Sequence, residues 1–515
     1  MRRTLPPVEP AIVPNETAPS TEPQLLRALG PVQGTMIVIG TVIGSGIFLK
    51  PAIIATQVPH FGGIMLVWIV SGLLSLAGAL AYAELGAMMP RAGGPYVFLR
   101  AAFGQRAAFL FGWTEFLINR PGSLAALAMA SVQYLSVLHP FTPLQQSGLA
   151  IAEILLLTAI NYAGVQFGAQ VQTVFTVAKV AALGGLIGGA LVMGQGSSAN
   201  FTPLLPESFD GASLSLFGGA MIGALWAYDG WANATSVAEE LRDPQRNVPL
   251  CLIAGTVIII GIYLSANVAY HYVLPLDVVQ HSQSSVPGGR EVAAETAFRL
   301  FGAAGLTFIA VGVMCSTFGA ANGVALTGSR ITFAMSRDRA FFRSIAAVHP
   351  RFRTPHVSIV VQAMLAIALI GFADRLYPVL RPVVASLQES ALAANAVTGP
   401  FIGWLGKTVA EKKLVFDVLT DCIIVVSWVF YALAVASVFV LRRKQPDTPR
   451  PYRCWGYPVV PALFVAMATW FVANAFKASP VEAVLGLGLA ALGLPAYAWF
   501  RKTGGGAEGD RTPDL

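Results

Sequence analysis

The chain has 515 residues, of which 55% are hydrophobic and only 11% are charged, and its formal net charge is +7. A soluble globular protein carries about 25% charged residues, so this composition excludes an ordinary cytosolic enzyme, a disordered chain and a protein that binds nucleic acid. It predicts an all-α polytopic membrane protein whose basic excess marks loops that face the cytoplasm.

The two ends of the chain are expected to be tails. Residues 1–28 are rich in proline, threonine and glutamate, and we interpret them as a disordered cytoplasmic tail rather than a cleaved signal peptide. Residues 501–515 are a second polar, cytoplasmic tail. Residues 29–500 are then one transmembrane domain.

The transmembrane domain holds about twelve apolar runs, each long enough to cross roughly 30 Å of hydrocarbon as a helix of ~20 residues. Most of them are apolar on all faces, and the alternating pattern of a β-barrel does not recur. The runs fall at 33–57, 62–88, 107–137, 147–163, 168–194, 213–240, 248–273, 302–334, 357–373, 415–441, 456–476 and 481–500.

Basic residues predict the orientation of these spans. With twelve spans and a cytoplasmic N-terminus, most lysines and arginines fall in cytoplasmic segments, as the positive-inside rule requires. Both termini are therefore expected in the cytoplasm, and the protein in the plasma or inner membrane. The segment 374–414 is expected to be an extended external loop that contains a short helix.

The first span contains a predicted helix break. Gly44, Ser45 and Gly46 lie in mid-membrane, and each glycine weakens a helix by about 1 kcal/mol relative to alanine. One interpretation is close helix packing through small residues. The other, which we favour, is a break whose free N–H and C=O groups require a polar cavity or a ligand.

The sixth span contains a second predicted break. Asp229 and Gly230 are poor helix formers in mid-span, and an aspartate there costs roughly 2.5–3.5 kcal/mol on insertion scales. The two broken spans are five helices apart, and interruptions at corresponding positions of two halves indicate an inverted-repeat transporter.

The two breaks together predict the chemistry of a ligand. A half-helix that begins after Gly44 presents free N–H groups and a positive dipole end, which suit a carboxylate. Free carbonyls at the ends of the preceding half-helices suit an ammonium group. The expected ligand is therefore an α-amino acid that the backbone holds.

Eight segments carry a resemblance to a known family. The chain resembles the amino acid–polyamine–organocation superfamily, and within it the L-type amino-acid transporters and their bacterial relatives, from about Leu29 to Phe500. The segments are GSGIF at 44–48, YAELGAMMPRAGGPYVFLR at 82–100, NRPGSLAALA at 119–128, AKVAAL at 178–183, WAYDGW at 226–231 with AEELRDPQRNVP at 238–249, STFGAANG at 316–323, GSRITFAMSRD at 328–338 and RPYRCWGYPVVP at 450–461.

The resemblance implies a LeuT-like fold, with two inverted five-helix repeats, two further helices, and breaks in helices 1 and 6. It implies that the N–H groups of Ser45 and Gly46 bind the substrate carboxylate. Further substrate-binding residues implied by the resemblance or by the breaks are Val42, Ile43, Gly44, Trp226, Tyr228, Asp229, Gly230, Trp231, Ser316 and Thr317.

Four polar residues within or near the spans are candidates for coupling or gating. The resemblance implies that Lys179 replaces a sodium site and holds the backbone of helices 1 and 8, either as a proton carrier or as a fixed structural cation. Arg120 is expected to pair with Glu115 or to reach an interface. Glu84 is expected to pair with a loop arginine, and Asn322 to bond free backbone.

The leading hypothesis is a secondary transporter of neutral amino acids that works by alternating access, as an exchanger or a proton symporter. A transporter of cationic amino acids or polyamines is one alternative, because Asp229 and two tryptophans could line an acidic or aromatic pocket. An amino-acid-sensing receptor on the same scaffold is another. Paired catalytic groups, a HExxH pattern and a Walker motif are missing from the sequence, so no enzyme activity, metal or cofactor is expected. An obligatory glycoprotein subunit is not expected either.

Overall fold

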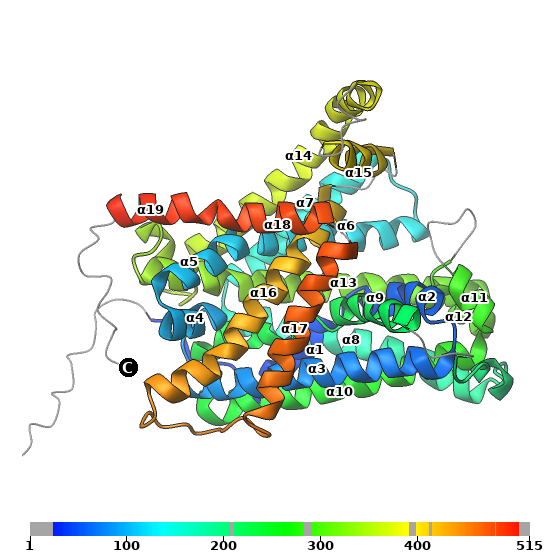
Figure 1. Cartoon of the computed structure of the whole chain (residues 1–515), viewed down its shortest axis with the longest axis horizontal. Helices are drawn as coiled ribbons and strands as arrows, with labels where there is room; N and C mark the ends of the chain where they lie inside the picture. The colour runs from blue at the N-terminus through cyan, green and yellow to red at the C-terminus, as the bar shows by residue number, and fades with distance from the viewer. Residues whose placement is uncertain are drawn as a thin grey trace, which may run out of the picture.

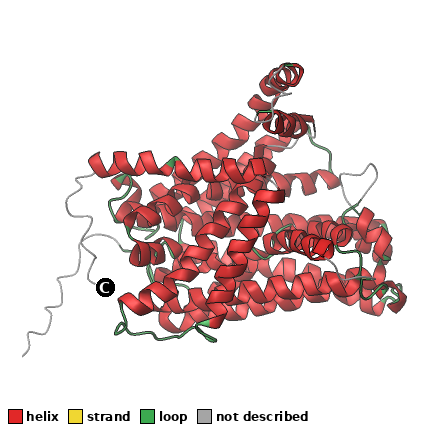
Figure 2. Cartoon of the chain, in the orientation of Figure 1, coloured by secondary structure: helices red, strands yellow, loops and turns green. Residues whose placement is uncertain are grey.

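The fold is built from helices. The computed structural model describes residues 24–206, 211–282, 290–390, 398–410, 415–478 and 480–503. Within those ranges every named element is a helix, and the β-type pairing is limited to an isolated bridge between Leu29 and Leu241 (Figure 2). This confirms the all-α fold class that the composition predicts.

In the described part of the chain, nine spans are long and apolar enough to cross a membrane. One is a composite of α5, a π-helical turn (η1) and α6, and another joins α18 to α19. They are α3 (Phe61–Met88), α5 (Gln105–Thr114) with η1 (Glu115–Asn119) and α6 (Arg120–Leu138), α7 (Pro143–Tyr162), α8 (Val165–Val192), α10 (Pro244–Val273), α13 (Ala303–Arg337), α16 (Val415–Lys444), α17 (Val459–Ala478), and α18 (Pro480–Ala491) with α19 (Gly493–Thr503).

The first predicted span is a bent pair of helices. α1 (Pro31–Val42) and α2 (Gly46–Gln57) are separated by three residues and inclined by 43°, and together they are long and apolar enough to cross the membrane. This is the break that Gly44 and Gly46 predict. Proline opens α1, as it does α7 and α10, because the first helical position needs no N–H group.

The sixth and ninth predicted spans are shorter than the others. α9 (Gly211–Ala227) ends after 17 residues, and the chain resumes as a 3₁₀ helix, η3 (Trp231–Glu240). In α14 (His356–Glu389) the apolar part is His356–Phe372. The rest of α14 and α15 (Gly399–Ala410) occupy the segment predicted as an external loop, whose side of the membrane remains a prediction.

Shorter helices connect the spans at both ends of the bundle. In Figure 1, α4 and α5 lie at the left end, whereas α11 and α12 lie at the right end. The short helices are α4 (Pro95–Phe103), η2 (Ser198–Phe201), α11 (Leu276–His281), α12 (Val292–Phe301) and η4 (Arg343–Ala346).

The broken helices are at the centre of the packing. α1 packs against α8, α10, α13 and η3, and α2 packs against α9. α10 runs along α3, and α13 packs against α6 and α8 (Figure 1). Each break is thus enclosed by unbroken helices, which keep its free backbone groups away from lipid.

Candidate functional site

The first break leaves N–H groups without acceptors. Residues 43–45 connect α1 to α2, and no described atom accepts a hydrogen bond from the N–H of Ser45, Gly46 or Ile47. A Cβ atom built on Gly44 would meet nothing within 4 Å. Open space therefore lies beside the positive end of the α2 dipole, where an anionic group is favoured.

The second break touches the first. Gly230 has φ +113°, a left-handed conformation that favours glycine. A Cβ atom at Gly230 would lie 3.0 Å from the carbonyl oxygen of Thr41, and Thr41 Oγ1 donates a hydrogen bond to the Gly230 oxygen at 3.1 Å. A Cβ atom at Gly46 would come within 2.8 Å of Ala227. Small residues thus let the two interrupted backbones meet.

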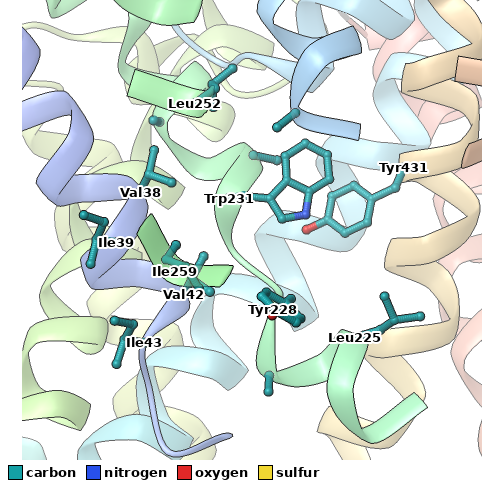
Figure 3. Close-up of a cluster of buried hydrophobic side chains, with 14 of the residues drawn as sticks. Val38, Ile39, Val42, Ile43, Leu225, Tyr228, Trp231, Leu252, Ile259 and Tyr431 are labelled. Atoms are coloured by element: carbon teal, nitrogen blue, oxygen red, sulfur yellow. The ribbon is translucent and has the colours of Figure 1, made fainter. Parts of the chain in front are cut away.

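Aromatic and aliphatic side chains surround this meeting point. In the view of Figure 3, Val42 of the first break lies between its neighbour Ile43 and Tyr228 of the second break, and the rings of Trp231 and Tyr431 lie above Tyr228. The rings of Trp231 and Tyr431 have centroids 5.5 Å apart. The Trp226 ring also borders the first break, because a Cβ atom at Gly46 would come within 3.3 Å of it. The ammonium of Lys50 on α2 lies over the same ring, with its Nζ 4.4 Å from the centroid.

Lys179 is buried between the first break and α13. Its Nζ donates hydrogen bonds to the carbonyl oxygens of Gly40 at 2.9 Å, Ile43 at 2.6 Å and Ser316 at 2.8 Å. Ser316 Oγ donates to the oxygens of Ile43 and Gly44 at 2.9 and 3.0 Å. The carbonyls that the break releases on this side are therefore satisfied by one ammonium and one hydroxyl.

Tyr263 of α10 satisfies carbonyls on the other side of the breaks. Its hydroxyl lies 2.9 Å from the oxygen of Ala227 and 3.2 Å from that of Val42. The Val42 oxygen also accepts from the Gly44 N–H at 2.8 Å, and the Trp226 oxygen accepts from the Asp229 N–H at 3.2 Å. Sequence reasoning missed Tyr263, since it stands in an apolar run without a motif.

A buried polar network extends from the second break. Asp229 Oδ1 accepts a hydrogen bond from the Tyr431 hydroxyl at 2.7 Å. Arg120 donates to Asn233 Oδ1 at 2.9 Å and pairs with Glu115 at 2.5 Å, which confirms the pair expected from the sequence. Glu115 opens the π-helical turn η1, and such turns are frequent at functional sites.

Three of the predicted residues lie away from the breaks or turn away from them. Thr317 Oγ1 bonds the backbone of its own helix at the Val313 oxygen. Asn322 donates to Gly168 O and Gln172 Oε1 and so joins α13 to α8. Glu84 is tied to a loop, as described next.

Glu84 fastens α3 to α16 and to the chain between α16 and α17. Its carboxylate accepts two hydrogen bonds from Arg442, at 2.9 and 2.6 Å, and one from the Cys454 N–H at 2.6 Å. Arg442 stands at the end of α16, and the loop arginine that the sequence predicts is Arg450, whose Nε lies 3.5 Å from Glu84 Oε1. Burial, together with the negative charge of Glu84, raises the pKa of the Cys454 thiol to about 12.

Among the residues that the structure describes, no group of three or more His, Cys, Asp or Glu side chains could hold a metal ion. The polar features around the breaks are N–H groups, carbonyls, hydroxyls, the ammonium groups of Lys179 and Lys50, and the carboxylate of Asp229. Groups of this kind are chemically suited to a small zwitterion or a similar polar molecule.

The chain is similar in sequence to known transporters of amino acids. The sequence model of a family described as amino acid permease matches residues 29–488. The serine/threonine exchanger SteT of Bacillus subtilis is 27% identical over 93% of this chain and 98% of its own length. The b(0,+)-type amino acid transporter 1 of Oryctolagus cuniculus is 32% identical over 67% of this chain and 71% of its own. The human large neutral amino acids transporter small subunit 2 is 29% identical over 92% of this chain and 80% of its own length.

Proposed function

The chain belongs to the amino acid permease family and is a multi-pass membrane transporter of amino acids, and on that premise we propose that it exchanges neutral amino acids across the cytoplasmic membrane. The relatives named as an exchanger and as a large neutral amino acids transporter subunit support the exchange and the substrate class. The similarity to each of these two relatives covers more than nine tenths of this chain.

The substrate binds where the two breaks meet. Its carboxylate lies on the N–H groups of Ser45 and Gly46, in the space beside Gly44, and its ammonium lies on the carbonyls at the second break. The single observation that carries this assignment is the set of N–H groups without acceptors at the start of α2. Tyr228, Trp231 and Ser316 contribute the surrounding wall.

Lys179 acts as a fixed cation. The carbonyls of Gly40, Ile43 and Ser316 already take its three N–H donors, and loss of the proton would leave buried carbonyls without a donor. A lysine that stays charged gives exchange without a coupled proton. It also makes a sodium ion at this position unnecessary.

Opening toward the cytoplasm requires rupture of ion pairs at one end of the bundle. Arg100 pairs with Asp338, Arg337 with Glu239, Arg330 with Glu240, and Arg442 with Glu84. We place this end in the cytoplasm, together with both termini, because basic residues concentrate there. The same proposal holds that the transporter works without an obligatory glycoprotein subunit.

Proteoliposomes that contain the purified full-length protein test the proposed function. Labelled neutral amino acids, arginine and a polyamine are supplied outside at pH 6 and pH 8, with and without unlabelled substrate inside. We expect uptake of neutral amino acids only with internal substrate, at similar rates at both pH values. Accumulation driven by a proton gradient without internal substrate would show symport instead. Binding without flux would show a sensor, and no exchange of any amino acid would defeat the proposal.

A further inference from the structure

A cavity of about 700 Å³ opens on the side of the molecule where the ion pairs gather. Its walls come from the segment before α1, the turn between α3 and α4, the ends of η3 and α13, and the chain around η4. We call it the basic cavity, defined by its five arginines, which are Arg27, Arg91, Arg337, Arg339 and Arg343.

The charge in the basic cavity is strongly unbalanced. Glu239 is the one acidic residue among the described lining residues. The Glu239 carboxylate already has partners, because it accepts two hydrogen bonds from Arg337, at 2.9 and 3.0 Å, and one from the Ala92 N–H at 2.8 Å. Within the described ranges, no hydrogen bond or ion pair joins Arg27 or Arg343 to another residue. In the part of the chain that the structure describes, the charges of Arg27 and Arg343 therefore remain without an acidic partner.

The walls of the basic cavity are fixed rather than loose. The N–H groups of Ala28 and Leu29 both donate to the Glu240 oxygen at 3.0 Å, and the Arg242 N–H donates to the Leu29 oxygen at 2.8 Å. Phe333, on the α13 wall, is 3% exposed. These backbone hydrogen bonds hold together cavity walls whose residues are up to about 300 positions apart in the sequence. Arginines that were only solvated in loops would not need walls held in this way.

We propose that the basic cavity binds an anion that bears a phosphate group. Arginine presents planar N–H pairs that match phosphate oxygens, and charge-assisted bonds of this kind are about twice as strong as neutral ones. The volume falls within the range of small-ligand sites. A phosphate held between Arg27 and Arg343 joins the segment before α1 to the η4 chain, so its binding favours the arrangement in which this end of the bundle is closed.

Titration of the full-length protein in a neutral detergent tests the site. Sodium pyrophosphate is the probe, ionic strength is held constant with sodium chloride because screening weakens such contacts, and the unfolding temperature is followed by tryptophan fluorescence. We expect the unfolding temperature to rise with the pyrophosphate concentration and then to saturate. In Arg27→Gln and in Arg343→Gln the apparent dissociation constant should increase roughly tenfold, as the loss of one charge-assisted bond implies. Arg106→Gln removes an exposed arginine that does not line the cavity, and it should leave the apparent dissociation constant unchanged.

A second arm distinguishes a free anion from a lipid headgroup. Dioctanoyl phosphatidylglycerol and dioctanoyl phosphatidylcholine replace pyrophosphate in the same titration. A rise with phosphatidylglycerol alone, lost in Arg343→Gln, supports a lipid phosphate, whereas a rise with pyrophosphate alone supports a soluble anion. No saturable rise with either probe, or equal rises in the cavity variants and Arg106→Gln, would overturn the proposal.

Discussion

The ion pair between Arg330 of α13 and Glu240 of η3 offers a direct test of how the closed end is held. Both side chains have 0% exposure. Arg330 Nε and one terminal nitrogen donate to the two carboxylate oxygens at 2.9 and 3.0 Å, and the other nitrogen donates to the Leu326 oxygen at 2.7 Å. The pair is thus fully desolvated and bidentate.

Removal of one partner strands a buried charge. We expect Arg330→Met to lower the free energy of unfolding by about 3–5 kcal/mol, because the Glu240 carboxylate remains buried without its cation. The double variant Arg330→Met with Glu240→Leu should recover most of this loss, since no charge is then left in the core. A larger loss for the single variant than for the double is the signature of a buried pair.

Unfolding of the purified protein in mixed micelles, titrated with dodecyl sulfate, measures these differences. Arg337→Met is the matched control, because the Arg337–Glu239 pair lies next to the buried one but is 38% and 22% exposed. A change below about 1 kcal/mol is expected there. The reasoning is refuted if Arg330→Met behaves like the control, or if the double variant loses as much stability as the single.

Three further predictions concern the site and its surroundings. Lys179→Ala should abolish exchange in proteoliposomes while the protein still elutes as a single folded species, because three buried carbonyls lose their donor; unchanged exchange would contradict the assigned role. Gly230→Ala should cost about 1–3 kcal/mol of stability, since φ is +113° and the new Cβ would press on the Thr41 oxygen, whereas Gly261→Ala, with open space around it, should change little. Cys454 is 4% exposed with its pKa raised to about 12, so maleimide at pH 8 should label it at least about a hundredfold more slowly than a free cysteine, and fast labelling would show that the loop opens.

The sequence determined the spans and the positions of the breaks. Hydrocarbon admits only backbone that satisfies its own hydrogen bonds, so long apolar runs must be helices, and glycines beside Ser45 or Asp229 mark where the helix cannot continue. The sequence also predicted the ion pair of Arg120 with Glu115, because the two residues are close in the chain.

The tertiary structure decided which distant groups meet. Tyr263 reaches the carbonyls of Val42 and Ala227 only because α10 packs beside both breaks. Glu84 finds Arg442 across 358 residues, and no local pattern specifies that partner. The basic cavity likewise exists only where separate segments fold against one another. Local sequence fixes where a helix must break, whereas long-range packing fixes what satisfies the groups that the break sets free.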